Sequence, residues 1–157
     1  MGGSETVVGV ISDTHGLLRP QALDALRGSD LIIHAGDVGE ANILDRLQAI
    51  APTFTVRGNI DMDAWTDSLP ETQLVKAGTL SLWVLHNIAH LDIDLAAKGV
   101  AAVIFGHSHK PLIEMRDGVL FFNPGSAGPR RFRLPVTLGR IVARDGGLHP
   151  EIIELQV

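Results

Sequence analysis

The chain has 157 residues, 45% of them hydrophobic, a formal net charge of −5 and no cysteine. This length predicts one domain over residues 1–157, and the lack of cysteine excludes disulfides and thiolate metal sites. The acidic balance gives no general attraction to nucleic acid or anionic membranes, and no apolar run reaches the roughly 20 residues of a membrane span. No secretory signal precedes the first strand, so we expect a cytoplasmic protein whose residues 1–5 are disordered.

The first part of the chain alternates between apolar, β-branched runs and helical patterns. Strands are predicted at 6–11, 31–34 and 53–57. Helices are predicted at 20–27, which Pro20 and Gly28 bracket, and at 40–50, where apolar residues recur at helical spacing. This alternation predicts right-handed βαβ units and a parallel sheet. In such sheets ligands bind at the carboxyl ends of the strands.

The second part is predicted to contain more strands than helices. Two runs, 73–76 and 80–85, flank a glycine turn and predict a hairpin, and a short helix is predicted at 91–98. Further strands are predicted at 100–104, 112–115, 119–122, 136–143 and 152–155. An exposed strand edge after Val136 could pair two copies of the chain, so a homo-oligomer stays open.

Side chains of the kind that bind metals stand where the predicted strands end. They are Asp13, His15, Asp37, Asn59, His86, His107 and His109. If the backbone stays extended after strand 100–104, His107 and His109 point to the same side. Taken singly, each of these residues could have a purely structural role: Asp and Asn are common in helix caps and Asx turns, and a lone His-x-His is more often structural.

Together the candidates comprise two carboxylates, one amide and four imidazoles. This set is too large for one tetrahedral ion and suits two ions that share a bridging carboxylate. Mixed nitrogen and oxygen donors suit Mn, Fe, Co, Ni or Zn better than Mg or Ca. Two divalent ions roughly 3.5–4 Å apart can clamp a phosphoryl group and hold a hydroxide between them.

Several spaced motifs, taken in order, resemble the calcineurin-like metallophosphoesterases, and most closely their small single-domain bacterial and archaeal phosphodiesterase branch. They are Ser12-Asp13-Thr14-His15-Gly16, His34-Ala35-Gly36-Asp37, Arg57-Gly58-Asn59, Gly106-His107-Ser108-His109 and Asn123-Pro124-Gly125-Ser126. The resemblance implies an α/β fold, a four-layer α/β/β/α sandwich with mixed sheets. It also implies that Asp13, His15 and His109 bind one ion and that Asn59, His86 and His107 bind the other, with Asp37 bridging the two.

We therefore expect a dinuclear metal-dependent phosphoesterase, with Mn²⁺ favoured and a metal-bridging hydroxide as nucleophile. The expected substrate is a small phosphoester, with nucleotides among the candidates, in a pocket that no cap domain covers. Ile60 stands where many phosphatases of the superfamily have a histidine that assists the leaving group, which favours diesters over monoesters. Asn87 stands where the family usually has glycine after the histidine, so the pocket there is narrowed or the turn differs. The alternative is a protein-interaction scaffold on the same fold, as in the retromer subunit; the complete ligand set favours the enzyme.

Other polar residues have weaker interpretations. His34, inside an apolar strand, is expected in the core or behind the ligands, and Asp61 is either a cap or a support behind the metal site. His90 and His149 are expected at the surface. The cations Arg130, Arg131 and Arg133 form either a phosphate-binding patch or, as we favour, a solvated charged face.

Overall fold

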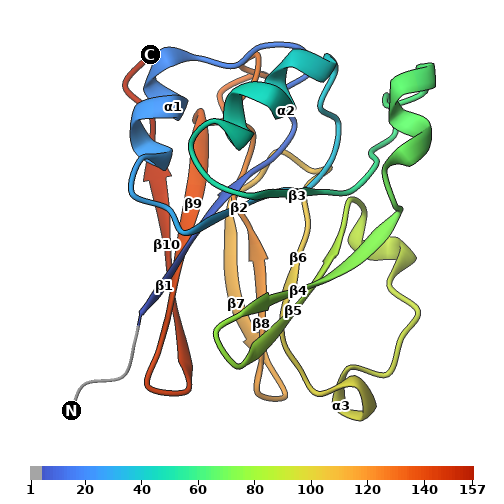
Figure 1. Ribbon diagram of the computed structural model, residues 1–157, viewed down its shortest axis with the longest axis vertical. Helices are drawn as coiled ribbons and strands as arrows, with labels where there is room; N and C mark the ends of the chain where they lie inside the picture. Colours follow the sequence, from blue (N-terminus) through green and yellow to red (C-terminus); the bar gives the residue numbers. More distant parts are fainter. Residues whose placement is uncertain (1–4) are drawn as a thin grey trace.

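The computed structural model describes residues 5–157 and contains two mixed five-stranded sheets (Figure 1). The first sheet has the order β10-β9-β1-β2-β3. Its strands are β1 (Thr6–Ile11), β2 (Leu31–His34), β3 (Thr53–Thr55), β9 (Thr137–Arg144) and β10 (Gly147–Glu154). The three N-terminal strands are parallel, as the βαβ pattern predicts, whereas β9 pairs antiparallel with β1 and β10 pairs antiparallel with β9.

The second sheet has the order β4-β5-β6-β8-β7. Its strands are β4 (Thr72–Ala77), β5 (Leu80–Leu85), β6 (Val100–Ile104), β7 (Leu112–Arg116) and β8 (Val119–Asn123). The predicted hairpin is present as β4 and β5, and β7 turns into β8 through Asp117 and Gly118, which both have positive φ. The central strands β5, β6 and β8 are parallel, so their carboxyl ends share one edge.

Helical segments cover the outer faces of both sheets. In Figure 1, α1 (Pro20–Leu26) and α2 (Ala41–Gln48) lie close together beside the first sheet, and α3 (Leu95–Lys98) lies far from them. Short 3₁₀ turns, η1 (Ala64–Ser68) and η2 (Ile88–His90), complete the elements. Within residues 5–157 no helix is both long and apolar enough to cross a bilayer.

Three apolar clusters hold these layers together. Alternate residues such as Val8, Val10 and Ile104 fill the space between the sheets, because strand side chains alternate with period two. The opposite side of the first sheet packs on α1 and α2 through residues such as Leu26 and Leu47. A third cluster covers the outer face of the second sheet. The expected four-layer α/β/β/α sandwich is thereby confirmed.

Two predicted elements differ from the structure. The helix predicted at 91–98 is reduced to α3, because Leu91 and Ile93 pack onto the sheet without helical spacing and the Asp94 side chain caps the backbone N–H of Ala97. Strand β10 begins at Gly147 rather than at 152, and it includes Pro150, which an edge strand tolerates.

The free edge expected after Val136 belongs to β10, because β9 is paired on both sides. Of the lead predicted to be disordered, residues 1–4 lie outside the described part of the chain.

Candidate metal centre

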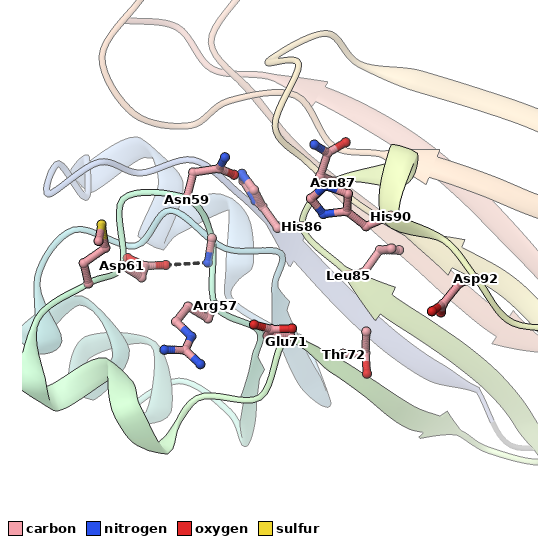
Figure 2. A pocket seen from close by; sticks show the side chains of 12 residues that line it. Arg57, Asn59, Asp61, Glu71, Thr72, Leu85, His86, Asn87, His90 and Asp92 are labelled. Atoms are coloured by element: carbon pink, nitrogen blue, oxygen red, sulfur yellow. Dashed lines mark hydrogen bonds between the residues drawn. The ribbon is translucent and has the colours of Figure 1, made fainter.

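The predicted ligand residues lie on loops that follow β1, β2, β3, β5 and β6. The structure places His15 against His109 and His86 against His107, with ring centroids 5.3 Å apart in each pair. Asn59 shares a cavity wall with His86, and Figure 2 shows the two side chains beside each other. The side chains of Asp13 and Asp37 lie among these imidazoles.

Each aspartate uses one oxygen for support and turns the other toward the histidines. Asp13 Oδ2 accepts hydrogen bonds from Ser12 Oγ (2.6 Å) and from the His107 backbone N–H (3.1 Å). Asp37 Oδ1 accepts from the backbone N–H of Ile60 (3.0 Å). The remaining oxygens, Asp13 Oδ1 and Asp37 Oδ2, face the ring nitrogens.

The distances among these groups are short. Asp13 Oδ1 lies 3.4 Å from His109 Nε2, 3.7 Å from His15 Nε2 and 3.8 Å from His86 Nε2. Asp37 Oδ2 lies 3.2 Å from His86 Nε2 and 3.5 Å from His15 Nε2. Potential ligand atoms form two groups, and within each group all of the atoms lie within 4.8 Å of one another. One group comprises Asp13, His15 and His109, and the other comprises Asp13, Asp37 and His86. Asp13 belongs to both groups.

Local hydrogen bonds fix the protonation of His86. Its Nδ1 lies 2.7 Å from the carbonyl oxygen of Ala35, an acceptor, so Nδ1 carries a proton and Nε2 is the nitrogen that faces the aspartates. Burial alone would lower the pKa of His86, but the carboxylates of Asp37 and Asp13 outweigh burial and raise it.

The two carboxylates shift in the opposite direction. Burial alone would raise the pKa of Asp13, but contacts with His109, His15 and Ser12 outweigh it and hold the pKa well below its usual range. The pKa of Asp37 is also lowered, since His86 and the Ile60 N–H outweigh burial. Both carboxylates are therefore anionic at neutral pH.

A divalent cation fits this donor set. Four buried atoms, Asp13 Oδ1, His15 Nε2, His86 Nε2 and His109 Nδ1, have no hydrogen-bond partner in the described structure. Buried polar atoms normally have partners, so such a cluster is unusual without a cation. Carboxylate oxygens and imidazole nitrogens are donors that first-row divalent ions accept.

The backbone holds most of these residues in an uncommon conformation. Asp13, His15, Asp37, His107 and His109 all have φ between 46° and 72°. L-residues rarely adopt this left-handed region, and such strain gathers at functional sites. The extended backbone on which His107 and His109 would point to the same side is therefore not present. Their side chains diverge, with His109 buried and His107 exposed against His86.

Asp61, predicted as a cap or support, ties two of the loops together. Its buried carboxylate accepts hydrogen bonds from the backbone N–H groups of Asp37 (2.9 Å), Val38 (3.0 Å), Gly39 (3.3 Å) and Gly58 (2.9 Å). Figure 2 shows the Asp61 side chain turned toward the loop that carries Asn59. One carboxylate thus fixes the loops after β2 and β3 relative to each other.

His34 is a core residue behind the ligands, as predicted. Its Nδ1 accepts from the Gly36 N–H (3.1 Å), so Nε2 carries the proton and donates to Thr14 Oγ1 (3.0 Å). Thr14 in turn donates to the Val38 carbonyl (2.8 Å). Burial lowers the pKa of His34 to about 4, which keeps the ring neutral.

Sequence reasoning missed three supporting residues. Ser12 donates to Asp13 Oδ2, and Ser126 Oγ donates to the Asp13 carbonyl (3.0 Å). Asn123 Nδ2 donates to the carbonyl oxygen of Gly106 (3.0 Å) and to Ser108 Oγ (3.2 Å), which fixes the loop that carries His107 and His109. The motif containing Asn123 and Ser126 is visible in the sequence, but its hydrogen bonds span up to 113 residues and leave no local signal.

Two cavities adjoin the candidate centre. One of about 730 Å³ is shown in Figure 2 and includes Asn59 and His86. The other, of about 610 Å³, includes His109. Asn87 lines the first cavity, and its side chain caps η2 by accepting from the Ala89 N–H (3.0 Å).

The exposed histidines and arginines lie as expected at the surface. His90 and His149 are exposed, although His90 also lines the first cavity. Arg130, Arg131 and Arg133 are exposed as well, and two of the three line the second cavity.

The chain is similar to known proteins both in sequence and in fold. The family model described as Calcineurin-like phosphoesterase superfamily domain matches residues 7–145. The probable metallophosphoesterase MJ0623 of Methanocaldococcus jannaschii is 36% identical over 137 residues, covering 79% of this chain and 69% of that protein. The phosphodiesterase MJ0936 of the same organism is 26% identical over 137 residues, covering 75% and 82%. The solved structure of Vps29 complexed with Zn²⁺ from Entamoeba histolytica has a TM-score of 0.71 at 23% identity, covering 96% and 100%.

Proposed function

Because the chain belongs to the calcineurin-like phosphoesterase superfamily, we propose that it hydrolyses phosphodiesters with two divalent ions held at the centre described above. The observation that carries the proposal is that the buried, unpartnered atoms His15 Nε2 and His86 Nε2 both lie within 3.8 Å of Asp13 Oδ1, which is itself unpartnered, and within 3.5 Å of Asp37 Oδ2. The likeness to a protein named as a phosphodiesterase supports the diester.

In the proposed site, His15 and His109 would hold one ion with Asp13, and Asn59, His86 and His107 would hold the other. The resemblance to the family implies that Asp37 would be shared by the two ions. Asp13 Oδ1 lies near His15 and His109 and also near His86, which supports Asp13 as a further residue that could contact both ions. The nitrogen and oxygen donors suit Mn, Fe, Co, Ni or Zn, and among these ions we favour Mn²⁺.

Bound divalent ions would supply Lewis acidity, lowering the pKa of water to near neutrality and offsetting the charge that develops on phosphoryl oxygens. The surrounding residues keep the ligand atoms deprotonated and oriented toward the ion sites. The proton on His86 Nδ1 is held by the Ala35 carbonyl, which leaves Nε2 free for a ligand bond. Asp13 and Asp37 are anionic before any ion arrives, because their pKa values are lowered.

Two features of the rim favour diesters. Ile60, 45% exposed, has no proton to give to a departing alkoxide, so poor leaving groups lack assistance from this position. The two cavities that adjoin the centre also suit a phosphate that is esterified twice, with one arm in each.

The test compares bis(p-nitrophenyl) phosphate with p-nitrophenyl phosphate, using chelated protein with and without added Mn²⁺. We expect metal-dependent hydrolysis with the diester preferred, and loss of activity in Asp13→Asn. The exposed variant Asp63→Asn is a matched control and should retain full activity. Equal turnover by the metal-free protein would refute the metal-dependent mechanism, and preference for the monoester would refute the diester assignment.

A protein-interaction scaffold is the second candidate, and the fold likeness to Vps29 favours it. Exposed apolar side chains on the loops that carry or flank the ligands, Leu17, Ile60 and Met62, are compatible with such a role. The same assay decides between the two. If wild type and Asp13→Asn show the same background hydrolysis at every metal tested, the scaffold is favoured.

A further inference from the structure

The cavity on the His109 side is a groove between two loops. Its walls come from the loop after β6, with His109 and Lys110, and from the turn before β9, with Arg131, Phe132 and Arg133. The volume of about 610 Å³ lies within the range of roughly 300–1,000 Å³ that small-ligand sites occupy. Because His109 is part of the wall, a ligand in this groove would lie beside the candidate metal centre.

The groove concentrates positive charge in an acidic protein. Lys110, Arg131 and Arg133 are all exposed, and the arginine ion pairs that the structure shows for residues 5–157 involve other arginines. Three neighbouring cations attract a phosphate, and arginine can bind it through two parallel hydrogen bonds. The other cavity is lined by Glu71 and Asp92 as well as by Arg57, and Figure 2 shows Glu71 near Arg57, so this cavity is less suited to an anion.

Phe132 gives the groove an aromatic face. Its side chain is 94% exposed, and its φ of 52° lies in the left-handed region that a bulky side chain rarely adopts, so both features are unfavourable for the folded chain alone. A hydrogen bond from the Leu134 N–H to the Arg131 carbonyl (3.0 Å) closes the turn that presents Phe132. Aromatic side chains flanked by cations are used to stack nucleobases.

We propose that this groove binds a nucleotide arm of the diester substrate, an inference that rests on the function proposed above. A phosphate that is not hydrolysed contacts Lys110, Arg131 and Arg133, and its base stacks on Phe132. The substrate class is therefore a small dinucleotide that carries a terminal phosphate. A long nucleic acid fits less well, because the chain's net charge of −5 repels a polyanion outside this groove.

The first test separates substrate recognition from catalysis. It measures kcat/KM with Mn²⁺ for the 5′-phosphorylated dinucleotide pApA, for ApA, and for bis(p-nitrophenyl) phosphate, which lacks both base and extra phosphate. Arg131→Gln/Arg133→Gln should lower kcat/KM for pApA at least about tenfold, and by a larger factor than kcat/KM for bis(p-nitrophenyl) phosphate. Arg46→Gln, in the last turn of α2, removes a charge outside the groove and should change neither value.

The second test needs no metal. Calorimetry with chelated protein measures binding of 5′-AMP, adenosine and inorganic phosphate. We expect 5′-AMP to bind more tightly than either fragment, with the affinity reduced by Phe132→Ala and by the arginine double variant. Equal binding of phosphate and 5′-AMP, or no effect of Phe132→Ala, would overturn the nucleotide assignment.

The outcomes keep the two proposals apart. No hydrolysis of bis(p-nitrophenyl) phosphate would refute the proposed function while 5′-AMP binding still tests the groove. Hydrolysis of that diester with pApA and ApA cleaved equally would refute the groove alone. Tighter binding of a 20-nucleotide single strand than of pApA would refute the small-dinucleotide class.

Discussion

The Asp61 carboxylate offers the sharpest test of how the centre is held in place. It is 2% exposed and receives four backbone N–H groups from the loops after β2 and β3. Asp61→Asn keeps the size of the side chain but replaces one oxygen with an NH₂ group, which cannot accept a hydrogen bond and repels the N–H groups that face it.

The expected cost follows from the bonds that are lost. Each oxygen of Asp61 accepts at least two N–H bonds, and a hydrogen bond to a charged group contributes roughly 1.5–3 kcal/mol. The free energy of unfolding should therefore fall by about 3–5 kcal/mol. Native proteins have free energies of unfolding of about 5–15 kcal/mol, so the variant stays folded only if the wild-type value is not near the lower end of this range. Metal affinity should fall about 10–100-fold, because Asp37 loses its fixed position.

Two measurements check this prediction. Urea unfolding in the presence of chelator gives the stability, and calorimetric titration with Mn²⁺ at a temperature where the variant is folded gives the affinity. Asp63→Asn, two residues along the chain and exposed, is the matched control. If Asp61→Asn unfolds at the same urea concentration as Asp63→Asn, the four hydrogen bonds do not hold the loops and the reasoning fails.

Three further predictions concern other parts of the centre. A Cβ on Gly106 would collide with Ser12 Oγ and lie 2.6 Å from Asp13 Oδ2, so Gly106→Ala should reduce bound metal in elemental analysis, whereas Gly118→Ala, which meets open space, should not. The pKa of His34 is about 4 when folded and 6.5 ordinarily, so the unfolded chain takes up the proton first. Stability in chelator should be full above pH 6.5 and fall by about 3 kcal/mol toward pH 4; His34→Asn should remove this part of the urea pH profile, and identical profiles would refute the assignment. His107 is exposed, so His107→Ala should weaken Mn²⁺ binding in calorimetry about tenfold or more without changing the melting temperature, and an unchanged affinity would remove it from the ligand set.

The sequence predicted the arrangement of strands well because both signals involved are local. Apolar runs such as 6–11 and 31–34 fill a buried parallel sheet, and the polar residues that follow them reach one edge as a geometric consequence. The same reasoning places Asp13 and Asp37 together from the sequence alone, whereas His109 follows β6 of the second sheet and reaches them only through the packing of the two sheets.

The parts that could not be predicted depend on contacts between distant segments. The hydrogen bonds from Ser126 to Asp13 and from Asn123 to Gly106 join residues far apart in the chain, and no periodicity reveals them. The extended backbone assumed for His107 and His109 failed because tertiary contacts hold both residues at positive φ. The helix predicted at 91–98 failed because the sheet beneath it accepts apolar side chains at irregular spacing.

The left-handed backbone of Asp13, His15, Asp37, His107 and His109 changes how a scanning experiment on this protein must be designed. Alanine is the usual deletion, but at these five positions it keeps the steric conflict of a side chain while removing the group that justified it. Glycine relieves that conflict in the folded chain, so the pair of substitutions at one position separates loss of a donor atom from release of torsional stress. A glycine variant that folds more stably than its alanine counterpart would reveal how much stability each loop sacrifices to present its donor.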